Sequence, residues 1–123
     1  MDETTATYPT VCPYLVVPDA DQVIAFLKGA FGAEQMQLHR AEDGRVRHAE
    51  LRLGTSVVMV GTSTPSRQAS LYLRVEDVDA AYARALSNGG IAEREPGNQD
   101  YGDRSAGVVD PGGNIWWLAG PLR

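Results

Sequence analysis

Several features that define specialised classes of protein are scarce in this sequence. It contains one cysteine, Cys12, so no disulfide can form within the chain, and a single thiol fits a reducing compartment. No apolar run approaches the roughly 18 residues of a membrane span, and residues 1–8 lack the basic and apolar regions of a signal peptide. We therefore expect a cytoplasmic protein that does not associate with membranes.

Positive charge is also scarce. Eleven basic residues stand against sixteen acidic ones, which gives a formal net charge of −5, and no Lys/Arg cluster follows a predicted helix. A nucleic-acid surface is therefore not expected. The chain has 123 residues, 43% of them hydrophobic, which suits one globular domain with a core of its own. We predict a flexible tail over residues 1–10 and a single domain over residues 11–120.

The first half of the chain predicts a strand, a helix and three more strands. A strand over residues 11–17 stops at a proline, and Asp19 can cap a helix with Gln22 in the capping-box position. A helical apolar stripe follows and ends at Gly32. Strands are then predicted over residues 34–41, 46–53 and 57–60, with a hairpin turn over 42–45. Residues 62–68 are predicted to be a linker.

The second half repeats this order. A strand over residues 71–75 leads to Asp77 as a helix cap, an apolar stripe follows, and Gly89-Gly90 ends the helix. A short strand over 91–95 and a loop over 96–103 precede a final hairpin, with strands over 104–109 and 115–118. The two βαβββ units cover about residues 11–61 and 69–120. Aligning Gly54–Gly61 with Gly113–Gly120 makes Val58 the counterpart of Trp117.

The last hairpin carries a recognisable pattern. Gly102-Asp-Arg104 precedes the turn Asp110-Pro-Gly-Gly-Asn114, and the turn runs into the aromatic strand Ile115–Leu118. This pattern resembles the end of a glyoxalase/bleomycin-resistance/dioxygenase domain of the vicinal oxygen chelate superfamily, within it the PhnB-like, glyoxalase-related subgroup. The resemblance and the repeat together imply an α+β fold, in which two βαβββ repeats form a concave mixed-sheet cup with the helices on the outer face.

The same resemblance implies where a metal would be bound. Members of the family that use a metal place four ligands, usually His and Glu, on the first and last strands of each unit. On this chain those positions fall at or next to Cys12, Val58, Ser70 and Trp117. Valine and tryptophan offer no ligand for a divalent metal and serine is a poor one, so we expect no metal cofactor.

Side-chain alternation along the predicted strands indicates which residues line the cup. Ala49, Leu51 and Leu53 should face the helix, which turns His48, Glu50 and Arg52 into the cup, and Trp117 should point inward while Trp116 and Leu118 pack beneath the helices. Our candidate ligand-binding residues are Cys12, Tyr14, His48, Glu50, Ser70, Tyr72, Tyr101, Arg104 and Trp117.

Several of these residues have a second interpretation. Cys12 is either a nucleophile or a small buried hydrophobe. The tyrosines and Trp117 form either an aromatic box or ordinary packing. Arg104 either anchors a ligand or, with Asp103, braces the loop against the hairpin. The closing turn over 110–114 is structural, because Pro111 presets φ and the glycines permit positive φ.

We draw three functional hypotheses from this reading. The first is metal-independent binding of a small organic molecule, aromatic or cationic and antibiotic-like, in a cup completed by a second subunit of a homodimer. The alternative is a lyase, isomerase or dioxygenase-like enzyme that uses His48 and Glu50 as catalytic residues, for acid/base or atypical metal chemistry. In the third, the domain acts only as a dimerising partner or regulator.

Overall fold

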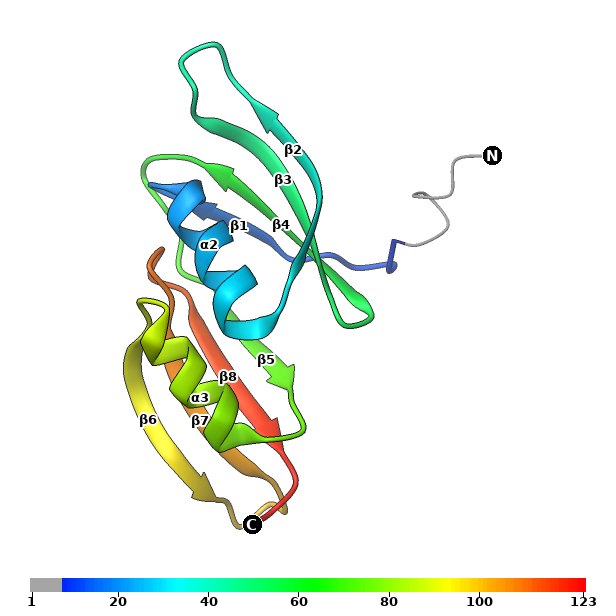
Figure 1. Cartoon of the computed structure of the whole chain (residues 1–123), viewed down its shortest axis with the longest axis vertical. Coiled ribbons are helices and arrows are strands. Elements are labelled where there is room, and N and C mark those ends of the chain that lie inside the picture. Colours follow the sequence, from blue (N-terminus) through cyan, green and yellow to red (C-terminus); the bar gives the residue numbers. More distant parts are fainter. Residues whose placement is uncertain (1–7) are drawn as a thin grey trace.

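The computed structural model describes residues 8–123, and its elements come in the same order twice (Figure 1). The first module consists of β1 (Tyr14–Val17), α2 (Ala20–Phe31), β2 (Glu34–Arg40), β3 (Val46–Leu53) and β4 (Ser56–Thr62). The second consists of β5 (Ser70–Arg74), α3 (Val78–Ser87), β6 (Ile91–Asn98), β7 (Arg104–Val109) and β8 (Ile115–Gly120). The predicted α+β class with two βαβββ repeats is confirmed. The predicted tail, residues 1–10, lies outside the described residues except for residues 8–10.

Local sequence signals determine where both helices begin. The Asp19 side chain accepts a hydrogen bond from the Gln22 amide at the start of α2, and Asp77 accepts one from the Ala80 amide at the start of α3. Helix α2 ends at Gly32, whose φ of 71° is left-handed and suits a residue without a Cβ. The predicted caps are confirmed at both helices.

Each module forms its own four-stranded mixed sheet. The strand orders are β1-β4-β3-β2 and β5-β8-β7-β6, with the first pair of each sheet parallel and the other neighbours antiparallel. Within residues 8–123, no strand of one sheet is hydrogen-bonded to a strand of the other. The two sheets of one chain are therefore not joined edge to edge into a single cup.

The strand registers correct one predicted equivalence. Tyr14 lies opposite Met59 in the β1–β4 ladder, and Tyr72 lies opposite Trp117 in the β5–β8 ladder. Met59, not Val58, is therefore the counterpart of Trp117. The β3–β4 turn holds two residues between paired positions and the β7–β8 turn holds five, so aligning the turn glycines slips the register by one residue. Because side chains alternate between faces, that slip exchanges the core side for the other side.

Several strands differ in length from the predictions. Strand β1 begins at Tyr14 rather than at residue 11, and β4 continues to Thr62 because Thr62 pairs with Val17. Strand β6 runs to Asn98 through the segment predicted as a loop, since residues 97 and 98 pair with β7 after a register shift that accommodates Pro96. The connection between β6 and β7 is therefore shorter than expected.

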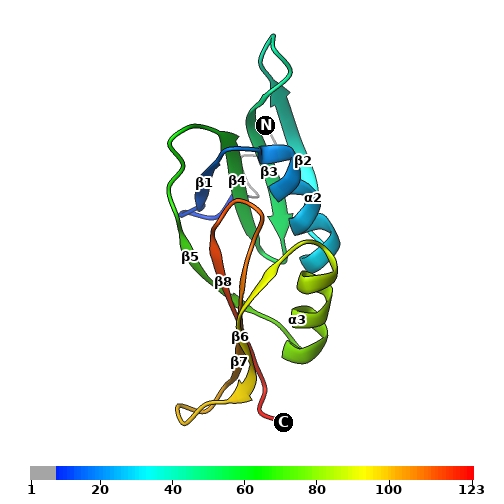
Figure 2. The same cartoon turned by 90° about the vertical axis from the view of Figure 1, so that its left-hand side faces the viewer.

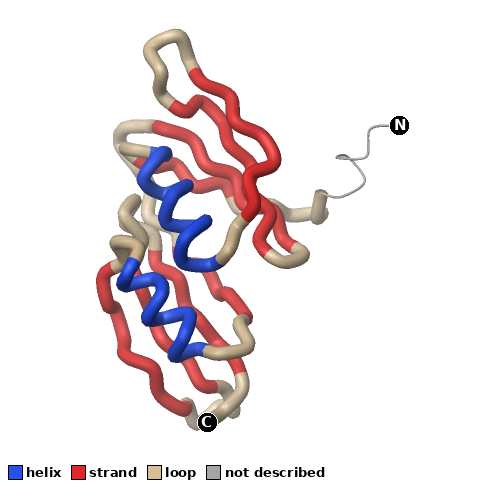
Figure 3. Tube along the Cα trace, in the orientation of Figure 1, coloured by secondary structure: helices blue, strands red, loops and turns tan. Residues whose placement is uncertain are grey.

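Both helices lie on the same side of the two sheets, α2 over the first and α3 over the second (Figures 2 and 3). The helices also contact each other, and the Phe31 ring lies 5.3 Å from the ring of Trp116 in the other module. One apolar cluster therefore spans both modules on the helix side. None of the helices in residues 8–123 is long and apolar enough to cross a membrane.

The turn between β7 and β8 is held by a buried carboxylate. Asp110 accepts hydrogen bonds from the amides of Gly112 (2.8 Å) and Asn114 (3.0 Å) and from the Trp116 indole (2.8 Å). The Asn114 side chain in turn accepts from the amide of Ala69, which precedes β5. The turn thereby fixes both the end of the hairpin and the start of the second module.

Replacing Asp110 with alanine is expected to lower the free energy of unfolding by about 3 kcal/mol, because buried donors lose their acceptor. Urea denaturation measures this change. Asp43→Ala is the matched control, since Asp43 also accepts from an amide in a hairpin turn but is exposed; its expected cost is below about 1 kcal/mol. Equal losses in the two variants would contradict the role given to Asp110.

Candidate functional site

The face of each sheet opposite its helix is called the open face here. In the first sheet the residues under α2 include Leu15, Ala49 and Leu51, all almost fully buried, so their strand neighbours turn the other way. The open-face residues of the first sheet include Tyr14, Val16, Gln37, His39, His48, Glu50, Arg52, Met59 and Gly61. Those of the second sheet include Ser70, Tyr72, Arg74, Arg94, Ser105, Gly107, Val109 and Trp117. Trp116 and Leu118 are buried on the helix side, as predicted.

A chain of hydrogen bonds joins three open-face residues of the first sheet. The Tyr14 hydroxyl lies 3.1 Å from Nδ1 of His48, and Nε2 of His48 lies 2.8 Å from a carboxylate oxygen of Glu50. The other Glu50 oxygen accepts a hydrogen bond from the hydroxyl of Tyr8. We call Tyr14, His48 and Glu50 the His48 cluster. The structure thus brings together two predicted catalytic candidates and a tyrosine from β1.

Exposure rises along the His48 cluster from Glu50 to Tyr14. Glu50 is 8% exposed, whereas Tyr14 is 47% exposed. Burial acts to raise the pKa of Glu50, but hydrogen bonds from Tyr8 and His48 outweigh it and hold the pKa below its usual value. The cluster therefore has a charged, shielded carboxylate at one end and an accessible phenol at the other.

Trp117 is the centre of the open face of the second sheet. Its indole nitrogen donates to the Ser70 hydroxyl at 3.0 Å, and its ring lies across Gly107, where a Cβ would come within 2.5 Å of it. The Arg94 guanidinium lies over the ring, 4.9 Å from its centre, and donates to the Ser105 hydroxyl. Trp117 faces the open side as predicted, but Arg94 already stacks on it.

The predicted aromatic box is divided between the two sheets. Tyr14 belongs to the first sheet, whereas Tyr72, Tyr101 and Trp117 belong to the second module, and no ring contact joins Tyr14 to these three in residues 8–123. The Tyr72 hydroxyl donates to Asp103, which also pairs with Arg74. The Tyr101 hydroxyl lies 3.5 Å from the Ser105 hydroxyl. Within one chain these residues form two separate surfaces.

Cys12 lies before β1 instead of within it. Its thiol contacts the Pro9 carbonyl at 3.5 Å, and the residue is half-buried. The structure therefore places Cys12 beside the first module rather than in the ladder that carries Tyr14.

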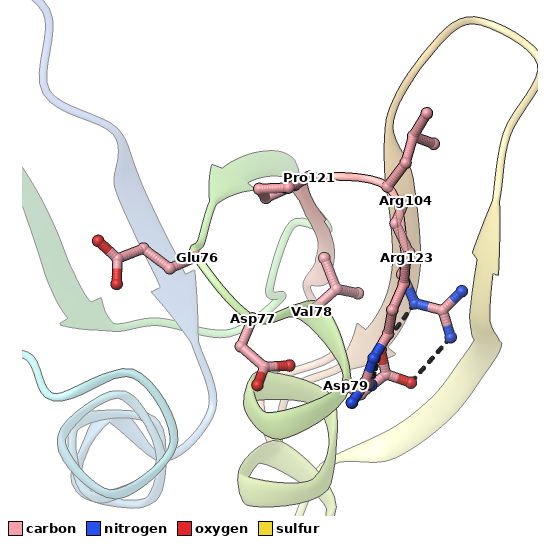
Figure 4. A pocket seen from close by; sticks show the side chains of 8 residues that line it. Glu76, Asp77, Val78, Asp79, Arg104, Pro121 and Arg123 are labelled. Atoms are coloured by element: carbon pink, nitrogen blue, oxygen red, sulfur yellow. Dashed lines mark hydrogen bonds and ion pairs between the residues drawn. The ribbon is translucent and has the colours of Figure 1, made fainter.

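Arg104 lies on the helix side of the second module. It binds both carboxylate oxygens of Asp79 in α3, at 2.7 and 2.9 Å, and Arg123 reaches the same carboxylate (Figure 4). These groups border a hollow of about 200 Å³ at the start of α3. Arg104 therefore joins β7 to α3 through Asp79, whereas Asp103, with which it was expected to brace the loop, pairs with Arg74.

Two residues contribute to the site although the sequence predicts no role for them. Arg94 lies within the strand predicted over 91–95, and Tyr8 lies in the predicted tail. The pairing of Arg94 with Gly107 across β6 and β7 places the long side chain next to Trp117. The composition of the strand carries no signal for that contact.

The residues at the family's metal positions do not fit a divalent metal. With the corrected register the four positions are Cys12, Met59, Ser70 and Trp117, of which Ser70 and Trp117 are hydrogen-bonded to each other. Thioether, indole and hydroxyl groups are poor ligands for the metals that prefer imidazole and carboxylate, so only the Cys12 thiol of the four could ligate one. In the described part of the chain, no group of three or more His, Cys, Asp or Glu residues is arranged to hold a metal ion.

Comparison with known proteins agrees with this architecture. The sequence profile of the Glyoxalase/Bleomycin resistance protein/Dioxygenase superfamily matches residues 7–118. An uncharacterized protein of Mycobacterium bovis is 33% identical over an alignment of 129 positions, gaps included, which covers 94% of this chain and 85% of that protein. TioX from Micromonospora sp. ML1 has a similar structure, with a TM-score of 0.76 and 24% identity over 93% of this chain and 99% of the other.

A further similar structure is that of the fosfomycin resistance protein FosX from Mesorhizobium loti. Its TM-score is 0.69 and its identity 17%, and the match covers 93% of this chain and 92% of the other. At these identities, the likeness to TioX and FosX establishes a common fold.

The ion pairs of Asp79 predict a measurable pH dependence of stability. Hydrogen bonds from Arg104 and Arg123 outweigh the effect of burial and lower the pKa of Asp79 from its ordinary 3.8 to about 2. Because the folded-state pKa is the lower one, this stabilisation is complete above the ordinary value and is lost as the pH falls toward 2.

In Asp79→Asn the free energy of unfolding should therefore fall less between pH 4 and pH 2 than it does in the unmodified chain. Urea denaturation across that pH range measures the difference. Asp43→Asn, at an exposed turn carboxylate, is the control. If the free energy of unfolding falls equally steeply below pH 4 with and without Asp79, the ion pairs do not stabilise the fold.

Proposed function

This chain belongs to the Glyoxalase/Bleomycin resistance protein/Dioxygenase superfamily, and from that premise we propose that it binds a small organic molecule without a metal ion. The observation that carries this proposal is the hydrogen bond between Trp117 and Ser70. Two of the four positions where the family would place metal ligands are bonded to each other. An indole ring at that place instead offers an aromatic wall, shared with the Arg94 guanidinium, of the kind that lines small-molecule sites.

We propose that a second copy of the chain completes the site. The helices cover one face of each sheet, and the open faces keep half-exposed aromatic side chains, among them Tyr14 and Tyr72. Since the two sheets are not paired within the chain, pairing of the first module of one chain with the second module of its partner would place the two kinds of open face opposite each other. A homodimer of this kind would bury both surfaces.

The proposed ligand contacts come from both modules. The first supplies the His48 cluster, and the second supplies Ser70, Tyr72 and Trp117. An aromatic or cationic molecule suits the rings and the Glu50 carboxylate. FosX, which shares the fold, is a fosfomycin resistance protein, and we include antibiotic-like molecules among the proposed ligands. Membership of the PhnB-like subgroup remains a prediction.

A second candidate function is acid/base catalysis by a lyase or isomerase of the superfamily. The observation that favours it is the His48 cluster itself, in which a buried carboxylate orients an imidazole toward an accessible hydroxyl. In an enzyme of this kind, His48→Gln would abolish turnover while ligand binding survives. A loss of ligand binding together with turnover would instead assign His48 to binding.

The binding proposal predicts a Trp117-dependent site for flat aromatic molecules. The probe 1-anilinonaphthalene-8-sulfonate should show saturable fluorescence enhancement, and Trp117→Ala should weaken its binding about tenfold because the stacking surface is lost.

Tyr82→Phe is the control for this experiment, because Tyr82 belongs to α3 and packs against the helix-side core. Its binding constant should match that of the unmodified chain. Unchanged binding in Trp117→Ala, or an absence of saturable binding to the unmodified chain, would contradict the proposal.

A further inference from the structure

The Tyr14 hydroxyl ends a chain of hydrogen bonds that begins at a buried carboxylate, and this order determines which hydrogen-bonding role the hydroxyl offers. We propose that the Tyr14 oxygen faces the open side as a hydrogen-bond acceptor, so that this site takes ligand groups that donate: an ammonium, an amide N–H or a hydroxyl. This inference rests on the proposed function, since it names the ligand chemistry of the same open face.

The first step is the state of Glu50. Its two oxygens contact the Tyr8 hydroxyl and Nε2 of His48, and these bonds favour the ionised carboxylate. An ionised carboxylate can only accept hydrogen bonds. The contacting nitrogen of His48 must therefore carry a proton.

The second step is the tautomer of His48. A neutral imidazole has one N–H and one nitrogen with a free lone pair. With the proton on Nε2, 2.8 Å from Glu50, the other nitrogen, Nδ1, is an acceptor. Glu50 thus selects the tautomer that His48 presents to Tyr14.

The third step is the direction of the Tyr14 proton. The hydroxyl lies 3.1 Å from Nδ1 and has a single proton, which it donates to that lone pair. The remaining lone pairs of the oxygen are directed away from His48, and Tyr14 is 47% exposed on the open face. A ligand that approaches this oxygen meets an acceptor and must itself donate.

The backbone keeps this geometry in place. The Tyr14 hydroxyl passes over Gly61, where a Cβ would lie 2.9 Å from the oxygen. A glycine at that point of β4 lets the phenol lie close to the sheet and reach His48. The nearby negative charge of Glu50 further favours donors that are cationic, such as an ammonium group.

The tautomer can be measured directly. Long-range ¹H–¹⁵N NMR of the full chain at pH 8, where an ordinary histidine is neutral, distinguishes the protonated from the free ring nitrogen. We expect His48 to carry its proton on Nε2, with the second imidazole, His39, assigned by its loss in His39→Gln. Glu50→Gln should populate the other tautomer, because an amide can also donate to Nε2. A proton on Nδ1 in the unmodified chain at this pH would overturn the inference.

Ligand selectivity is tested with two aromatic cations of equal charge. Benzylammonium has N–H donors and benzyltrimethylammonium has none, so the ratio of their dissociation constants isolates hydrogen-bond donation. Tyr14→Phe should reduce the preference for benzylammonium by about tenfold to a hundredfold, the usual value of one hydrogen bond to a charged group. Tyr82→Phe, on the helix side, should leave the ratio unchanged.

A ratio that is the same in Tyr14→Phe overturns the acceptor role of Tyr14. If neither cation binds while 1-anilinonaphthalene-8-sulfonate does, the inference fails and the proposed function stands. If none of the three probes binds, the proposed function fails as well.

Discussion

Each sheet of this protein buries one face beneath its own helix and leaves the other uncovered, and the remaining features of the structure depend on that asymmetry. Because side chains alternate along a strand, neighbouring residues lie on opposite faces of the sheet and have different surroundings. Trp116 closes the helix-side core, where its indole is bonded to Asp110, and the adjacent Trp117 turns to the open face. Two neighbouring tryptophans thus have different roles because they lie on opposite faces of one strand.

Several polar groups of the open faces are already bonded to one another. Trp117 donates to Ser70, Arg94 donates to Ser105, and the His48 cluster is a continuous chain of hydrogen bonds. Preformed networks of this kind hold side chains in one orientation, so less conformational entropy is lost when a ligand binds. They also occupy donors and acceptors that a metal site would need to leave free for the ion.

Local signals in the sequence predicted most of the fold. The caps Asp19 and Asp77 and the alternation along β3 depend on residues within a few positions, and the structure agrees with them. Long-range pairing was harder to predict. The register that makes Met59 the counterpart of Trp117 depends on the length of a turn, and one residue of error exchanges the two faces.

The candidate site could be predicted only in part, because some of its contacts are long-range as well. His48 and Glu50 are two residues apart on one strand, so their common orientation follows from the sequence. The contact of Arg94 with Trp117 crosses between strands, and the contact of Tyr8 with Glu50 joins segments 42 residues apart. Neither contact has a local signature, because long side chains reach neighbours that only the folded sheet brings near.

The central claim is that two copies of this chain form a metal-independent cup for an organic molecule. Native mass spectrometry of the protein as purified, with metal analysis of the same sample, tests this most directly. We expect a dimer that carries no stoichiometric divalent metal and that retains, or takes up when offered, a small organic molecule. A monomer, or a species with one divalent ion for each chain, would contradict it.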